Sequence, residues 1–233
     1  MMYKAISVWV CFFLIAGCTH SKTDSGVGED KEQVSDSNLA GDEKKVIVFF
    51  GNSLTAGYGV KISEAYPALI QLKIDSLTLP YSVVNAGVSG ETTASGNSRI
   101  DWILENPLDV FVLELGGNDG LRGIPVEETL RNLQSIIEKV KTSYPEARIV
   151  LAGMQVPPNM GKVYSDEFSD IYPKLAEENE VLLIPFLLEG VGGERQLNQS
   201  DGIHPTAEGH KIVAETVWSV LRNVLINKER AIS

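Results

Sequence analysis

Two short segments near opposite ends of the chain carry side chains that could cooperate in nucleophilic catalysis. Ser53 follows the apolar run at residues 46–50, and Asp201 and His204 stand three residues apart in DGIHP at 201–205. A carboxylate can keep one imidazole nitrogen protonated while the other nitrogen takes the proton of a serine hydroxyl. We therefore interpret Ser53 as a candidate nucleophile, His204 as its general base and Asp201 as the group that orients the imidazole.

Two glycine-containing segments could supply hydrogen-bond donors for a developing negative charge. NAGVSGETT at 85–93 contains Gly90, whose N–H group no side chain obstructs, and GGND at 116–119 contains the Asn118 amide. The candidate oxyanion hole consists of the N–H groups of Ser53 and Gly90 with the Asn118 side chain. Each segment alone also has a plain interpretation, a helix N-cap for Ser53 and ordinary turns for the glycines.

The elements that must position these residues follow from the pattern of apolar runs. Runs of strand length stand at 46–50, 82–85, 110–113, 148–152 and 181–184, and helical patterns such as 126–143 lie between them. This alternation predicts an α/β fold, in which a parallel sheet carries helices on both faces and binds ligands at the carboxyl ends of its strands. His210 falls in the last helix, where we expect it on the solvated side.

The four motif blocks resemble the SGNH (GDSL-type) hydrolase family. GNSL at 51–54, NAGVSGETT, GGND and DGIHP occur in the family's order, and the resemblance runs from about residue 46 to about 217. It implies a three-layer α/β/α sandwich with a flavodoxin-like five-stranded parallel sheet, and neither metal nor organic cofactor. It also implies Ser53, Gly90, Asn118 and His204 as signature positions, with Asp201 completing the triad. Asn52 stands where the family usually has Asp.

Within that family, the stretches GNSLTAGYGV and LELGGNDGLRGIP are most similar to arylesterase, acyl-CoA thioesterase and lysophospholipase enzymes. The resemblance implies hydrolysis of carboxylic esters or thioesters through an acyl-enzyme on Ser53. A carbohydrate O-deacetylase of the same family and a catalytically inert ligand-binding lipoprotein are the alternatives. An apolar trough for the acyl chain could be lined by residues that otherwise serve only loop packing: Leu121, Ile124, Met154, Val156 and Pro157.

Composition narrows the classes of partner. The 233 residues carry a formal net charge of -11, so the surface repels phosphate backbones and nucleic-acid binding is disfavoured. The chain contains neither G-x-x-x-x-G-K-[ST] nor G-x-G-x-x-G, which disfavours a nucleotide binder. We expect a monomer that acts on a small-molecule acyl ester or thioester.

The first residues have the pattern of an export signal. Residues 1–17 contain Lys4 and an apolar stretch that ends in LIAGC, which resembles a bacterial lipobox with Cys18 as the lipidated residue. An ordinary signal peptide that happens to contain a cysteine is the alternative. Residues 18–45 are polar and predict a disordered tether, and residues 46–233 predict the hydrolase domain. The expected location is the bacterial cell envelope, with the protein held on the periplasmic or outer-membrane face by its lipid.

Overall fold

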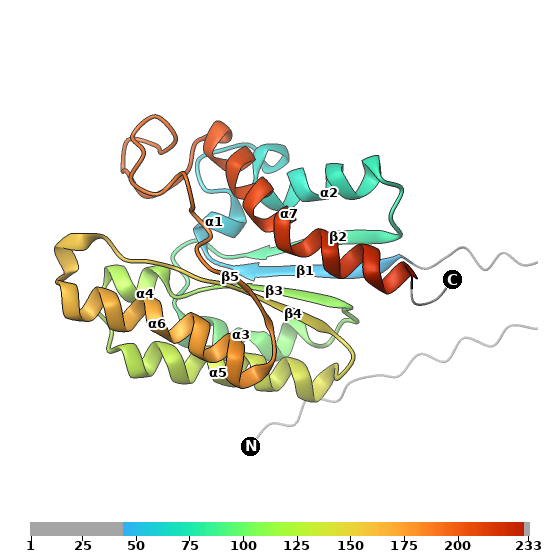
Figure 1. Ribbon diagram of the computed structural model, residues 1–233, viewed down its shortest axis with the longest axis horizontal. Helices are drawn as coiled ribbons and strands as arrows, with labels where there is room; N and C mark the ends of the chain where they lie inside the picture. The colour runs from blue at the N-terminus through green and yellow to red at the C-terminus, as the bar shows by residue number, and fades with distance from the viewer. Residues whose placement is uncertain (1–43, 231–233) are drawn as a thin grey trace, which may run out of the picture. The chain divides into compact units, whose positions relative to one another are not determined.

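A computed structural model describes residues 44–230, in which strands and helices alternate along the chain (Figure 1). The expected signal peptide, the Cys18 anchor and nearly all of the tether lie outside these residues and stay predictions. The elements are β1 (Lys45–Gly51), α1 (Ser53–Ala56), η1 (Ile62–Glu64), α2 (Tyr66–Ser76), β2 (Tyr81–Gly87), α3 (Thr93–Ile103), β3 (Val110–Glu114), α4 (Gly117–Leu121), α5 (Val126–Ser143), β4 (Arg148–Ala152), η2 (Pro158–Met160), α6 (Lys162–Asn179), β5 (Leu182–Ile184) and α7 (Ala207–Arg230).

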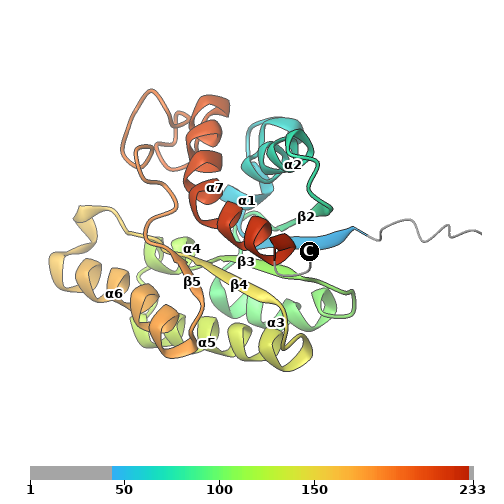
Figure 2. The same ribbon diagram turned by 45° about the vertical axis from the view of Figure 1, so that its right-hand side comes forward.

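The five strands form one parallel sheet in the order β2-β1-β3-β4-β5. Helices α2 and α7 cover one face of the sheet, and α3, α5 and α6 cover the other (Figures 1 and 2). This is the three-layer α/β/α arrangement that the sequence predicts, and each of the five apolar runs is a strand. Because all five strands are parallel, their carboxyl ends meet at one edge, where Gly51, Gly87 and Glu114 lie in register.

The core lies on both faces of the central strands. Phe49 and Phe50 of β1 are fully buried although they point to opposite faces of the sheet. Helix α5 covers one face with the predicted apolar stripe, in which Leu133, Ile137 and Val140 have no exposed surface. Full burial of such a side chain contributes about 1.5–3 kcal/mol. Within residues 44–230, no helix is both long and apolar enough to cross a bilayer.

A buried carboxylate holds the turn between β1 and α1. The Oε2 atom of Glu114 accepts hydrogen bonds from the Asn52 backbone N–H (3.1 Å) and the Thr55 hydroxyl (2.8 Å), and Oε1 accepts one from the Asn52 amide (2.7 Å). These donors flank Ser53 on both sides. At Gly51, a Cβ atom would lie 2.5 Å from Oε2 of Glu114, so only glycine fits there. Burial raises the pKa of Glu114 to about 7, against the opposing effect of the donors.

His210 is buried, contrary to the expectation that it lies on the solvated side of α7. Only 1% of its surface is exposed, its ring stacks on Tyr66, and its Nδ1 atom accepts the Tyr66 backbone N–H at 3.3 Å. The helical spacing explains the error, because His210 lies on the same stripe as the buried Val213 and Ala214. Burial, with a smaller effect of His204, lowers the pKa of His210 to about 4.

The lowered pKa of His210 gives the folded state a specific sensitivity to acid. The unfolded chain binds a proton at this imidazole near its ordinary pKa of 6.5, whereas the folded chain binds it only near about 4. Acidification between these two values therefore favours unfolding, by up to about 3 kcal/mol. Glu114 acts in the opposite sense, because its raised pKa makes the folded state the better proton acceptor between the ordinary pKa of 4.5 and about 7.

We predict that His210→Asn removes the contribution of His210 to the loss of stability on acidification and leaves the contribution of Glu114 in place. An asparagine oxygen can still accept the Tyr66 N–H group, so the variant should fold. Urea unfolding at about pH 7.5 and about pH 4.5 should show a loss on acidification that is roughly 2 kcal/mol smaller in the variant than in the unaltered chain. Equal losses in the two proteins would contradict the assignment.

A second prediction concerns the pair formed by Asn52 and Glu114. In Glu114→Gln, the new amide group faces the Asn52 amide, so that two hydrogen-bond donors stand opposite each other. The variant should have a free energy of unfolding about 1–3 kcal/mol lower than the unaltered protein, and its turnover should fall. The double variant Asn52→Asp, Glu114→Gln reverses the donor and the acceptor and should recover most of both losses.

The matched control for this pair is Asp109→Asn, which changes a carboxylate that accepts the Val46 N–H at 2.9 Å, at the amino end of β1. This variant should keep its turnover whatever it does to stability. The test measures urea unfolding and ester hydrolysis for the unaltered protein, Glu114→Gln, the double variant and Asp109→Asn. A double variant no better than Glu114→Gln would show that the pairing does not hold the turn.

Candidate active site

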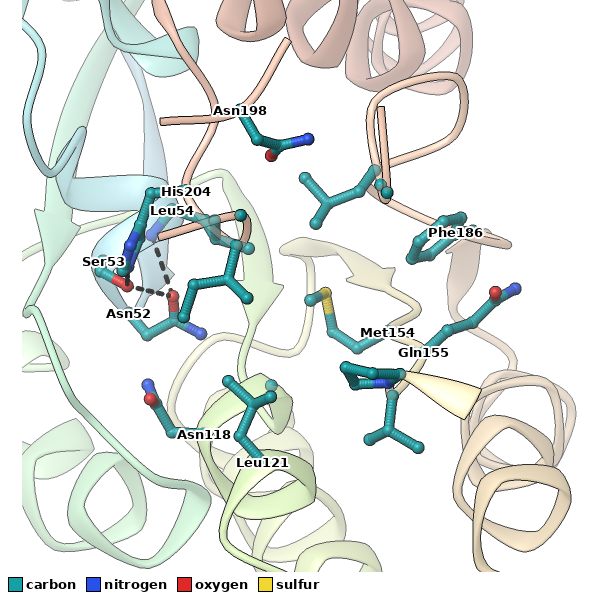
Figure 3. A pocket seen from close by; sticks show the side chains of 18 residues that line it. Asn52, Ser53, Leu54, Asn118, Leu121, Met154, Gln155, Phe186, Asn198 and His204 are labelled. Atoms are coloured by element: carbon teal, nitrogen blue, oxygen red, sulfur yellow. Dashed lines mark hydrogen bonds between the residues drawn. The ribbon is translucent and has the colours of Figure 1, made fainter. Parts of the chain in front are cut away.

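The structure brings Ser53, His204 and Asp201 into one hydrogen-bonded chain at the carboxyl edge of the sheet. The Ser53 hydroxyl lies 2.9 Å from Nε2 of His204, and Nδ1 of His204 lies 2.8 Å from Oδ2 of Asp201. Figure 3 shows Ser53 and His204 side by side at one end of a pocket. Because Asp201 only accepts when ionised, Nδ1 carries the ring proton and Nε2 is free to accept the proton of Ser53.

The Asp201 carboxylate is fixed by the loop that precedes α7. Its Oδ1 atom accepts the backbone N–H groups of Ile203 (3.0 Å) and His204 (3.1 Å), so both oxygens are engaged. The hydrogen bond from the His204 ring, followed by the one from Ile203, lowers the pKa of Asp201 to about 2. Asp201 is therefore ionised over the neutral range and can stabilise a positive charge on the imidazole.

The His204 ring also packs against an aromatic side chain that the sequence motifs do not mark. The Tyr58 ring lies 4.7 Å from it, centroid to centroid, and closes one side of the imidazole. Gln199 ties the two segments together, because its side chain donates to the Tyr58 carbonyl (2.7 Å) and its backbone N–H donates to the His204 carbonyl (2.7 Å). The imidazole is thus held by its ring plane as well as by its nitrogens.

The predicted oxyanion hole consists of three hydrogen-bond donors, two of which, on Ser53 and Asn118, belong to residues that line the pocket. Among the described residues, no atom accepts the backbone N–H of Ser53 or that of Gly90. The Asn118 amide donates one hydrogen to the Glu91 carbonyl (3.0 Å), and its second hydrogen has no acceptor among the described residues. Asn118 and Ser53 both line the pocket (Figure 3). Gly90 does not line it, but its φ of +83° is a left-handed conformation that favours glycine.

The loop that carries Gly90 is held from several sides. Arg122 donates to the Gly90 carbonyl at 3.1 Å. Arg99 forms two hydrogen bonds to the buried Glu91 carboxylate (2.6 and 2.8 Å) and lies over the Phe50 ring. A donor that is held in place before the substrate arrives needs no reorganisation when negative charge develops.

The pocket beside Ser53 has a volume of about 450 Å³ and is mostly apolar. Four of the five residues predicted for an acyl trough line it, namely Leu121, Met154, Val156 and Pro157, and sequence reasoning missed Leu54, Phe186, Leu188 and Ile203. Ile124 does not line the pocket. The chain turns at Gly123, after which the Ile124 carbonyl accepts the Tyr164 hydroxyl at 2.8 Å, on the side of α6.

The arrangement can deprotonate a serine beside an apolar cavity and place donors near the new charge. Within residues 44–230, no three His, Cys, Asp or Glu side chains are grouped as metal ligands would be. The sequence motifs did not indicate a role at the site for Glu114, Tyr58 or Asn198. Of these three residues, Asn198 lines the pocket. Glu114 had a visible signal, since it is an ionisable residue that directly follows the apolar run 110–113.

The chain is similar in sequence to proteins of one known family. Residues 49–212 match the family model described as GDSL-like Lipase/Acylhydrolase family. The chain is 38% identical over 182 residues to "Esterase TesA" of Pseudomonas aeruginosa, covering 78% of this chain and 90% of that protein. It is 42% identical over 170 residues to "Thioesterase 1/protease 1/lysophospholipase L1" of Escherichia coli K12, covering 72% and 79%.

A solved structure extends the likeness from sequence to fold. The crystal structure titled "Crystal structure of AlinE4, a SGNH-hydrolase family esterase" superposes with a TM-score of 0.65 at 40% sequence identity, covering 78% of this chain and 97% of that one. The family model matches most of residues 44–230, and both curated relatives are more than 30% identical to this chain. This chain belongs to the GDSL-like lipase/acylhydrolase family, whose members include the SGNH esterases.

Proposed function

We propose that this protein hydrolyses carboxylic esters and thioesters by transferring the acyl group first to Ser53 and then to water. The observation that carries the proposal is the unbroken hydrogen-bonded chain from Asp201 through His204 to Ser53, at the end of an apolar pocket. The names of the relatives, which include esterase, arylesterase and thioesterase, support the same reaction class.

In the first half of the reaction, the Ser53 oxygen attacks the carbonyl carbon and its proton passes to Nε2 of His204. Asp201 stabilises the imidazolium that results, because its carboxylate already accepts the Nδ1 proton. The imidazolium then gives its proton to the departing alcohol or thiol, and the acyl group remains on Ser53. In the second half, a water molecule gives a proton to His204 and attacks the acyl carbon. The bond between the acyl carbon and the Ser53 oxygen then breaks, the imidazolium returns the proton to that oxygen, and the carboxylic acid leaves.

Negative charge on the carbonyl oxygen would be met by the N–H groups of Ser53 and Gly90 and by the free amide hydrogen of Asn118. Donors of this kind typically contribute about 3 kcal/mol each to transition-state stabilisation. The acyl chain would occupy the apolar pocket, whose size is in the range of small-molecule sites. Every group in this mechanism comes from one chain.

We predict that Ser53→Ala abolishes hydrolysis of p-nitrophenyl esters and labelling by a fluorophosphonate, because both reactions need the serine oxygen. The substitution removes one hydroxyl from a turn that the hydrogen bonds of Asn52 and Thr55 to Glu114 hold, so thermal stability should change little. Continued hydrolysis by the purified variant would overturn the role of Ser53.

Asn118→Ala is the matched control, because it leaves Ser53, His204 and Asp201 in place. It should still react with the fluorophosphonate, but its kcat should fall by about 10²-fold or more. Labelling of both variants would exclude Ser53 as the nucleophile. A protein that labels but hydrolyses only acetylated polysaccharide would favour the O-deacetylase alternative, and no labelling of the unaltered protein would favour an inert binding protein.

We further propose that the protein is exported and anchored in the cell envelope by a lipid on Cys18. The pattern LIAGC supports this proposal, and the polar residues that follow it would separate the domain from the lipid surface. The unaltered protein, expressed in a bacterium, should partition into detergent-rich phase, whereas Cys18→Ala should stay in the aqueous phase with the same specific activity. Aqueous partitioning of both would leave only an ordinary signal peptide.

A further inference from the structure

The chain turns back to the nucleophile as soon as helix α1 ends, within residues 51–60, the nucleophile segment. The backbone N–H groups of Gly57 and Tyr58 both donate to the Ser53 carbonyl, each at 3.0 Å. Gly57 has a φ of +76°, the left-handed conformation in which glycine commonly ends a helix. The Tyr58 backbone is thus fixed to the residue that carries the nucleophile, while its ring lies against the His204 imidazole.

One glutamine connects this segment to residues 198–206, the histidine loop. The side-chain nitrogen of Gln199 donates to the Tyr58 carbonyl (2.7 Å) and to the Pro205 carbonyl (3.0 Å). The Gln199 backbone N–H donates to the His204 carbonyl at 2.7 Å. A single residue therefore holds the loop on both sides of the imidazole and also binds the nucleophile segment.

The contacts of Asp201 cannot place His204 relative to Ser53. Among the described residues, Asp201 accepts hydrogen bonds only from Ile203 and His204, which belong to its own loop. A loop that shifted as a unit would keep all of these bonds and still move Nε2 away from the serine hydroxyl. A contact between the histidine loop and the nucleophile segment is needed to fix that distance.

The bond from Gln199 to the Tyr58 carbonyl is such a contact. In the described part of the chain, the only other hydrogen bond between the nucleophile segment and the histidine loop is the catalytic one between serine and imidazole. The backbone lies close against the amide, because a Cβ atom at Gly59 would stand 2.1 Å from the Gln199 side-chain oxygen. The glycine thus leaves room for the amide beside the carbonyl that it binds.

We propose that Gln199 is a positioning residue, which through its bond to Tyr58 holds the His204 imidazole against the Ser53 hydroxyl. This inference rests on the proposed function, since it concerns the same hydrogen-bonded chain. Without the bond, the histidine loop would be free to shift, and a displacement of about 1 Å at a catalytic group can cost about 10²-fold in rate. Most of the pocket lining comes from other segments, so kcat should fall by more than KM rises.

The variant Gln199→Met removes both side-chain donors and keeps a similar length. With p-nitrophenyl butyrate as substrate, kcat should fall by about 10-fold or more, whereas KM should change by about threefold at most. The rate of labelling by a fluorophosphonate should fall in parallel, because that reaction also needs the imidazole to activate the serine. A kcat within about twofold of the unaltered protein would overturn the proposal.

A double-mutant cycle shows whether Gln199 acts through Tyr58. Tyr58→Ala removes the ring and should lower kcat to a similar degree, and Tyr58→Phe, which restores a ring, should recover most of that loss. If both residues hold the same imidazole, Gln199→Met should lower kcat only slightly further when Tyr58→Ala is already present. A double variant in which the two losses multiply in full would contradict the coupling.

Gln71→Met is the matched control for a purely structural effect. The Gln71 side chain likewise donates to a backbone carbonyl, that of Tyr81 (3.3 Å), and accepts the Val83 N–H (2.7 Å). These bonds lie toward the amino end of β2, whereas the catalytic chain lies at the carboxyl ends of the strands. The variant should lose stability in urea and keep its kcat. A fall in kcat as large as that of Gln199→Met would assign both effects to stability and overturn the proposal.

Two outcomes separate this inference from the reaction itself. If the unaltered protein hydrolyses no ester, the proposed function fails first. If it hydrolyses esters and Gln199→Met and Tyr58→Ala both keep their kcat, hydrolysis stands and the positioning role is lost. Should Gln199→Met not fold, Tyr58→Ala and Tyr58→Phe still decide the question, because equal kcat in these two variants would remove the ring through which Gln199 is proposed to act.

Discussion

The turn that carries Ser53 depends on a buried carboxylate that forms no salt bridge with any described residue. Moving Glu114 into the interior is costly, and the only compensation comes from donors on either side of the nucleophile. The carboxylate and the turn therefore stabilise each other, because displacement of Asn52 or Thr55 would leave Glu114 unsatisfied. Gly51 belongs to the same constraint, since any side chain there would occupy the space of the carboxylate.

Hydrogen bonds also connect this turn to α2 and α7, the helices on one face of the sheet. The Thr55 hydroxyl, which donates to Glu114, is also bonded to the Tyr66 hydroxyl at 2.7 Å, and the Tyr66 backbone N–H donates to His210. His210 lies on α7, shortly after His204 in the chain. The turn that carries Ser53 is therefore connected by buried polar contacts to α7, the helix that follows His204 in the chain. Cooperative networks of this kind rigidify the groups that they connect.

The sequence predicted the sheet because each strand is a run of apolar residues with a turn at its end, and the motifs follow three of those strands. It could not predict contacts that depend on the direction of a side chain. His210 lies on the apolar stripe of α7, so its burial was readable from helical spacing, but a histidine there invited the wrong interpretation. Ile124 is apolar and close to Leu121 in sequence, yet a glycine turn separates it from the pocket. The partnership of Asn52 with Glu114 joins residues 62 positions apart and leaves no local pattern.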